Sequence, residues 1–170
     1  MSKWAVHNKW VCKMGIPEEV AKYMQPAIDS KGPSDKIIVM PADFAKHCQE
    51  PKIPLAGHKD CGLMDFGNLH DRGKLSGTVV HKMVQQEDLK FLVLKGNDHV
   101  RAYYLHFILD YLDHPTIREY MNQGSTVSDC IAMYVRNKAV VVEGTGGCLT
   151  AVVDFLKARS TELEEDYHKK

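Results

Sequence analysis

Residues 98–113, with the sequence DHVRAYYLHFILDYLD, decide the fold of this chain. Their apolar side chains surround a helix on almost every side: Leu105, Phe107, Ile108, Leu109, Tyr111 and Leu112. A helix that is apolar all round is buried among other elements rather than lying on a surface. Pro115 stops it. We therefore expect a central, buried helix in a mainly α-helical protein.

The segments on either side of this helix carry further helix signals. Trp4, His7, Val11 and Met14 are spaced 3, 4 and 3 residues apart, which places them on one helical face. Similar signals predict helices over 4–14, 17–30, 78–94, 127–142 and 148–166. Residues 41–50 look like a short helix, and residues 37–39 could form a short strand. The sequence thus predicts an all-α fold: a single domain over 1–170, built as a compact bundle of about six helices.

Two segments are rich in glycine. Residues 51–77 contain seven Gly or Pro residues, which predicts a long loop. Loops of that length in a compact domain are usually functional or disordered. Residues 143–147, EGTGG, lack the G-x-x-x-x-G-K-[ST] pattern of a phosphate-binding loop, so we interpret them as a helix linker.

Composition excludes several classes of protein. Lys plus Arg and Asp plus Glu both number 22, so the formal net charge is zero, which argues against nucleic acid as a main partner. No apolar stretch is long enough for membrane insertion. The five cysteines include no CxxC pair, which favours reduced thiols and a cytoplasmic location. Near-zero charge offers little electrostatic opposition to a homo-oligomer.

The central helix also carries a polar stripe whose members are 4, 3, 4 and 4 residues apart: His99, Tyr103, His106, Asp110 and His114. A buried aspartate is costly unless it is paired or bound to a cation. His106 and Asp110 point the same way and can share one metal ion. The simpler alternative is a His–Asp hydrogen bond that joins two core helices.

Two further histidines have alternative interpretations. His7 lies on the apolar face of the first helix, where it is either a satisfied core residue or a metal ligand. His81 is in line with Gln85 and Asp88, which equally describes a solvated helix face.

The string Leu69-His70-Asp71-Arg72-Gly73-Lys74 resembles the signature of HD-domain metal-dependent phosphohydrolases. In that family a His-Asp doublet, an earlier His and a later Asp hold one or two metal ions in a helical bundle. The resemblance implies that six residues of this chain are metal ligands: His7, His70, Asp71, His81, His106 and Asp110. His47, 23 residues before His70, is a rival to His7 for the early ligand.

The same resemblance implies that the protein is a metal-dependent hydrolase of phosphoesters, either a phosphomonoesterase or a phosphodiesterase. A divalent transition metal (manganese, iron, zinc or cobalt, as one or two ions) would lower the pKa of a bound water and so activate it. Asp71 would anchor metal, and Lys74 or Arg72 would hold the phosphate of a small-molecule phosphoester.

A second family gives the same chemistry. The W-x-x-H pattern at Trp4 and His7, with H-x-x-x-D at His106 and Asp110, resembles zinc-dependent phospholipase C-like α-helical phosphodiesterases. That resemblance implies a ligand set composed of His7, Asp71, His81, His106 and Asp110.

A third string, Gly57-His58-Lys59-Asp60-Cys61-Gly62, resembles the zinc-binding motif of β-class carbonic anhydrases. His58 and Cys61 would be the ligands. The family's upstream Cys-x-Asp-x-Arg motif is missing, because neither Cys12 nor Cys48 is followed by it.

The alternative from another class is a non-catalytic helical protein that retains the scaffold with a structural metal or none. The glycine-broken segment before the His70-Asp71 doublet favours it, since a catalytic site requires rigid support.

Overall fold

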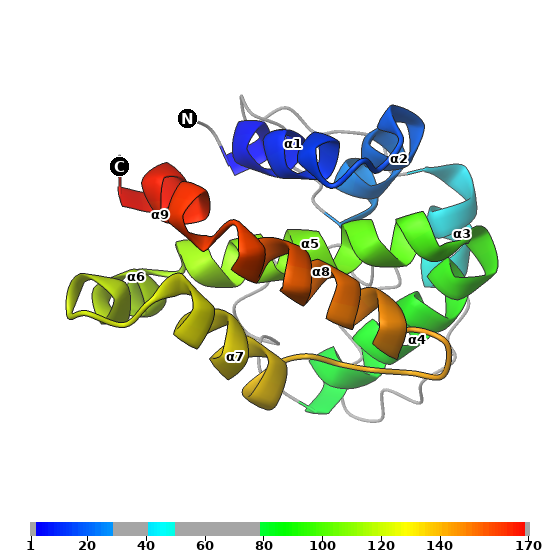
Figure 1. Cartoon of the computed structure of the whole chain (residues 1–170). Coiled ribbons are helices and arrows are strands. Elements are labelled where there is room, and N and C mark those ends of the chain that lie inside the picture. Colours follow the sequence, from blue (N-terminus) through cyan, green and yellow to red (C-terminus); the bar gives the residue numbers. More distant parts are fainter. Residues whose placement is uncertain (1–2, 29–40, 50–78, 169–170) are drawn as a thin grey trace.

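The computed structural model of this chain describes residues 3–28, 41–49 and 79–168. Within these ranges every regular element is a helix (Figure 1), and the helices in chain order are α1 (Lys3–Lys13), α2 (Glu18–Ile28), α3 (Ala42–Gln49), α4 (Val79–Lys95), α5 (Asn97–Asp113), α6 (Pro115–Asn122), α7 (Val127–Asn137), α8 (Gly146–Ala158) and α9 (Ser160–His168). The expected all-α class is confirmed for this part of the chain. The expected strand at 37–39 and loop at 51–77 lie outside the described residues.

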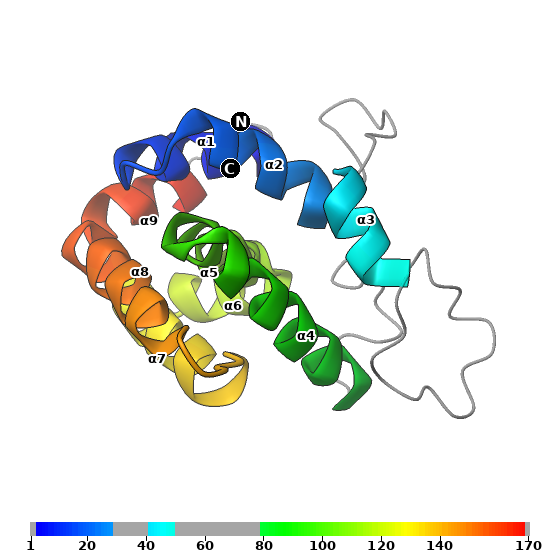
Figure 2. The same ribbon diagram turned by 90° about the vertical axis from the view of Figure 1, so that its right-hand side faces the viewer.

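The helix α5 lies at the centre of the molecule. It contacts α1, α2, α4, α6, α7 and α8, and Figure 2 shows it inside an arc formed by α1, α2, α9, α8 and α7. Its side chains Leu105, Ile108, Leu109 and Leu112 are all 0% exposed. The burial expected from the sequence of this helix is therefore confirmed.

Pro115 does more than stop α5. It is also the first residue of α6, where a proline's fixed φ suits the helix start and its missing N–H costs nothing. The side chain of His114 caps α6, because its Nδ1 accepts a hydrogen bond from the backbone N–H of Thr116 at 3.3 Å. This short helix is absent from the sequence prediction.

The helix predicted over 127–142 ends earlier, at Asn137. The following segment contains Val140, Val141 and Val142, whose branched side chains lower helix propensity. Tyr104 of α5 holds this segment in place, since its hydroxyl donates to the Val140 carbonyl at 2.6 Å.

The helix predicted over 148–166 is divided into α8 and α9. The break lies at Arg159, whose φ of −119° is not helical.

The turn between α4 and α5 requires a glycine. Gly96 has a φ of 131°, which L side chains rarely adopt. Its N–H donates to the Leu92 carbonyl at 3.1 Å and so ends α4. The chain then reverses, and α4 packs against α5. Among the described helices, none is both long enough and apolar enough to cross a membrane.

Candidate metal centre

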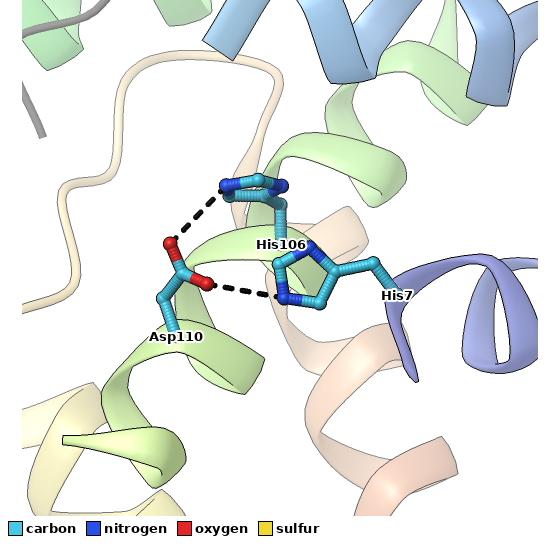
Figure 3. Close-up of side chains that lie close together, drawn as sticks. All are labelled: His7, His106 and Asp110. Atoms are coloured by element: carbon cyan, nitrogen blue, oxygen red, sulfur yellow. Dashed lines mark ion pairs between the residues drawn. The ribbon is translucent and has the colours of Figure 1, made fainter. Parts of the chain in front are cut away.

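Three polar residues meet where α1 crosses α5. His7 comes from α1, while His106 and Asp110 are one turn apart on α5. The Asp110 carboxylate lies between the two imidazoles (Figure 3): Oδ1 is 3.0 Å from His7 Nε2, and Oδ2 is 3.2 Å from His106 Nε2. The imidazole rings contact each other edge to face, with centroids 4.4 Å apart. The chain thus brings together three of the six ligands expected from the sequence.

The group is almost completely removed from solvent. The exposed fractions of the side chains are 4% for His7, 6% for His106 and 16% for Asp110. Burial alone raises the pKa of Asp110, but the charge and hydrogen bond of His106, together with those of His7, outweigh it and hold the pKa well below its usual range. Asp110 is therefore a carboxylate at neutral pH.

The donor set fits a transition-metal ion. One ligand atom from each residue lies within 4.8 Å of the others. Two ligands bound to one ion at about 2.0–2.2 Å are at most about 4.4 Å apart, so small side-chain rotations close the group around an ion. Two imidazoles and a carboxylate suit zinc, iron, manganese or cobalt. Three protein ligands also leave coordination positions for water. Without an ion, the same residues form a hydrogen-bonded link between α1 and α5.

Contacts with the last helix hold α1 in position. Lys9 Nζ donates to Asp166 Oδ1 at 2.7 Å, and Trp10 Nε1 donates to Asp166 Oδ2 at 2.8 Å. Trp10 is fully buried. One carboxylate of α9 therefore anchors the turn of α1 that follows His7.

We expect Asp166→Ala to lower the free energy of unfolding by about 1–2 kcal/mol, because it leaves the buried Trp10 N–H without an acceptor. Chemical denaturation monitored by circular dichroism measures this change. Asp154→Ala, which removes an exposed carboxylate of α8, is the control and is expected to have little effect. Equal stabilities of the two variants would contradict the anchoring role of Asp166.

The remaining members of the α5 stripe have other surroundings. His99 packs edge to face against Tyr23 of α2, with ring centroids 5.3 Å apart. His114 caps α6. Tyr103 is buried, and burial raises the pKa of its hydroxyl well above the usual value. Helical spacing grouped these residues on one face, but their distances along the helix place them beside different neighbours.

Several expected site residues lie outside the described part of the chain, namely His58, Cys61, His70, Asp71, Arg72 and Lys74. The backbone of His81 is in α4, but its side chain is not described.

His47 belongs to a second buried pair, which the sequence did not predict. Its Nε2 lies 3.0 Å from Asp88 Oδ1, and both residues are buried. The ring of His47 also stacks on Phe91, with centroids 4.5 Å apart. Burial raises the pKa of Asp88 to about 6, although its hydrogen bond with His47 opposes the rise. The sequence signal for this pair was the alignment of Asp88 with Gln85 and His81 on one face of α4. A solvent-exposed helix face shows the same pattern, so the signal did not identify a buried pair.

Comparison of this chain with models of protein families, with curated proteins and with solved structures finds no match.

Proposed function

We propose that this protein is a metal-dependent hydrolase of phosphoesters. In this proposal His7, His106 and Asp110 hold a divalent transition-metal ion between α1 and α5, and the ion activates a water molecule. The observation that carries the proposal is the meeting of two buried imidazoles and one partly buried carboxylate at a single point of the core. A bound metal would lower the pKa of that water toward neutrality and would neutralise charge on a phosphoryl oxygen.

The resemblance to HD-domain phosphohydrolases adds the substrate-binding part of the proposal. Asp71 would anchor metal, while Arg72 and Lys74 would bind the phosphate of a small-molecule phosphoester. A cytoplasmic location is also proposed, with support from the thiols of Cys12, Cys130 and Cys148, which are free in the described chain.

Metal content of the purified, tag-free protein tests the first half of the proposal. We expect about one equivalent of zinc, iron, manganese or cobalt by mass spectrometry, with a second ion possible if the expected His70-Asp71 doublet also binds. His7→Gln is expected to reduce metal binding at least tenfold, because it removes one of three ligands. His47→Gln is the matched control, since His47 is an equally buried histidine on a different aspartate. If the wild-type protein contained no metal, even after incubation with added metal ions, the proposal would be refuted.

The second half is tested with chromogenic phosphate monoesters and diesters. The metal-loaded wild type is expected to hydrolyse at least one of them, and the metal-free protein and His7→Gln are expected to be inactive. If the metal-loaded protein hydrolysed neither monoesters nor diesters, the proposed hydrolase activity would be refuted, but the proposed metal site would not.

A structural metal centre is the second candidate. The burial of both imidazoles favours it, because a substrate must reach a catalytic ion. X-ray absorption of the loaded protein separates the candidates. A shell closed by protein ligands supports a structural ion, whereas a shell that includes water oxygens supports catalysis.

A further inference from the structure

Within the metal-capable group, His7 is the member whose position depends on a second helix. His106 and Asp110 lie one turn apart on α5, so the geometry of one helix sets their separation. His7 belongs to α1, and the 3.0 Å contact between its Nε2 and Asp110 Oδ1 holds only if α1 keeps its place against α5. Metal ligands must lie within about 0.2 Å of their proper distances, so a metal centre at this point requires contacts that fix the two helices.

The last turn of α9 contacts both of these helices. Figure 2 shows α9 beside α1. Asp166 accepts hydrogen bonds from Lys9 Nζ at 2.7 Å and from Trp10 Nε1 at 2.8 Å, both on α1. The next residue, Tyr167, donates its hydroxyl to the Leu109 carbonyl of α5 at 2.9 Å. Two adjacent residues of α9 therefore link α1 to α5.

Both ends of this link lie close to metal-capable residues in the chain. The Leu109 carbonyl belongs to the peptide bond that joins Leu109 to Asp110, so the Tyr167 hydroxyl holds the backbone of Asp110 directly. Trp10 follows His7 by three residues, which is almost one turn of α1. Tyr167 is buried, and this burial, together with nearby carboxylates, raises the pKa of its hydroxyl well above the usual value. The hydroxyl therefore remains a donor at neutral pH.

A further contact fixes the backbone of α9 at the same residue. Arg118 of α6 donates from Nη2 to the Tyr167 carbonyl at 2.8 Å. The helix α6 begins at Pro115, two residues after the end of α5. Tyr167 is thus held relative to α5 through its side chain and, by way of α6, through its backbone.

We propose that Asp166 and Tyr167 are positioning residues of the metal centre: this pair, the α9 clamp, holds α1 at the separation from α5 at which His7 and Asp110 bind one ion. The metal-dependent part of this inference rests on the proposed function. The two contacts of the clamp act in series, because releasing either end frees α1 to shift relative to α5. Two independent stabilising contacts would instead have additive effects.

A double-variant cycle on zinc affinity, measured by competition with a chelator, is the test. Tyr167→Phe removes the hydroxyl and keeps the ring. We expect it to weaken zinc binding by about tenfold, the lower end of the effect of an outer-sphere residue, because it acts through the backbone of Asp110 and not on a ligand atom. Asp166→Ala is expected to have a similar effect. The variant with both changes is expected to bind zinc about as weakly as either single variant.

Tyr104→Phe is the matched control. It also removes a buried hydroxyl that donates from or to α5 and a backbone carbonyl, but its acceptor is Val140, in the segment before α8. It is expected to lose stability, as Tyr167→Phe does, and yet to bind zinc as the wild type does. The visible absorption of the cobalt-loaded protein, which depends on ligand geometry, gives a second readout. We expect this spectrum to change in Tyr167→Phe and not in Tyr104→Phe.

Wild-type zinc affinity in Tyr167→Phe, or additive losses in the double variant, would overturn the α9 clamp while the proposed function survived. If the wild type bound no metal, the proposed function would be refuted, and the metal-free protein would decide on the clamp. In that protein the nitrogen chemical shift of His7 Nε2 reports its contact with Asp110. A shift that changes in Tyr167→Phe but not in Tyr104→Phe would support the clamp, and a shift unchanged in both would overturn it.

Discussion

Asp110→Ala is expected to abolish stoichiometric metal binding and to destabilise the metal-free protein by about 3 kcal/mol. The carboxylate is the only group that contacts both His7 and His106 in the metal-capable cluster of the described chain. Its loss leaves two buried imidazoles without their shared partner, and removing one member of a buried pair costs about that much. Mass spectrometry measures the metal content, and denaturant unfolding of the metal-free protein measures the stability.

Asp88→Ala is the matched control for this variant. This variant also removes an aspartate that lies 3.0 Å from a histidine Nε2, but the histidine is His47 rather than His7 or His106. We expect it to keep the wild-type metal content. If Asp110→Ala retained metal, the site would move away from α5, to candidates such as His58 and Cys61. If Asp88→Ala lost metal as well, the loss would report general destabilisation rather than a ligand.

The two buried aspartates are expected to respond to pH in opposite directions. Burial raises the pKa of Asp88 to about 6 from an ordinary value of 3.8, so its ionised form is disfavoured in the folded protein. The stability that Asp88 contributes is fully present below about pH 4 and is lost as the pH rises to about 6. The difference between the two pKa values corresponds to about 3 kcal/mol.

Asp110 has the reverse behaviour, because two histidines favour its ionised form and only one does so at Asp88. Its pKa lies well below the usual value. The stability contributed by its carboxylate is therefore present above about pH 4 and is lost as the pH falls through the folded-state pKa.

Asparagine variants separate these contributions from those of the other carboxylates. We expect Asp88→Asn to gain stability relative to the wild type as the pH rises from about 4 to about 6. Asp110→Asn is expected to be less stable than the wild type at neutral pH and to approach it on acidification below about pH 4. Unfolding free energies of the three metal-free proteins between pH 3 and pH 8 provide the measurement. If the unfolding free energies of the wild type and Asp88→Asn changed in parallel with pH, burial would not shift the pKa of the Asp88 carboxyl group.

Local pattern was enough to predict the central helix and its polar face. Apolar side chains cover most of the circumference of α5, so its burial follows from the sequence alone; they are Leu105, Phe107, Ile108, Leu109, Tyr111 and Leu112. The 3.6-residue repeat also aligns His106 with Asp110. Pro115 shows the limit of the same reasoning, since a proline that ends one helix is equally suited to begin the next. The break at Arg159 is followed directly by Ser160 and Thr161, which are residue types that favour a helix start.

What the sequence by itself determined is therefore the helical class, the burial of α5 and the polar pair that α5 carries into the core, because each depends on neighbours within one or two helical turns. Only the tertiary structure decided which histidine joins that pair. His7 and His47 both lie on short N-terminal helices, and packing brings His7 to Asp110 and His47 to Asp88. The α9 clamp is likewise a product of three helices meeting. Contacts between residues far apart in the chain depend on how helices cross, and the spacing of residues within one helix carries no information about that crossing.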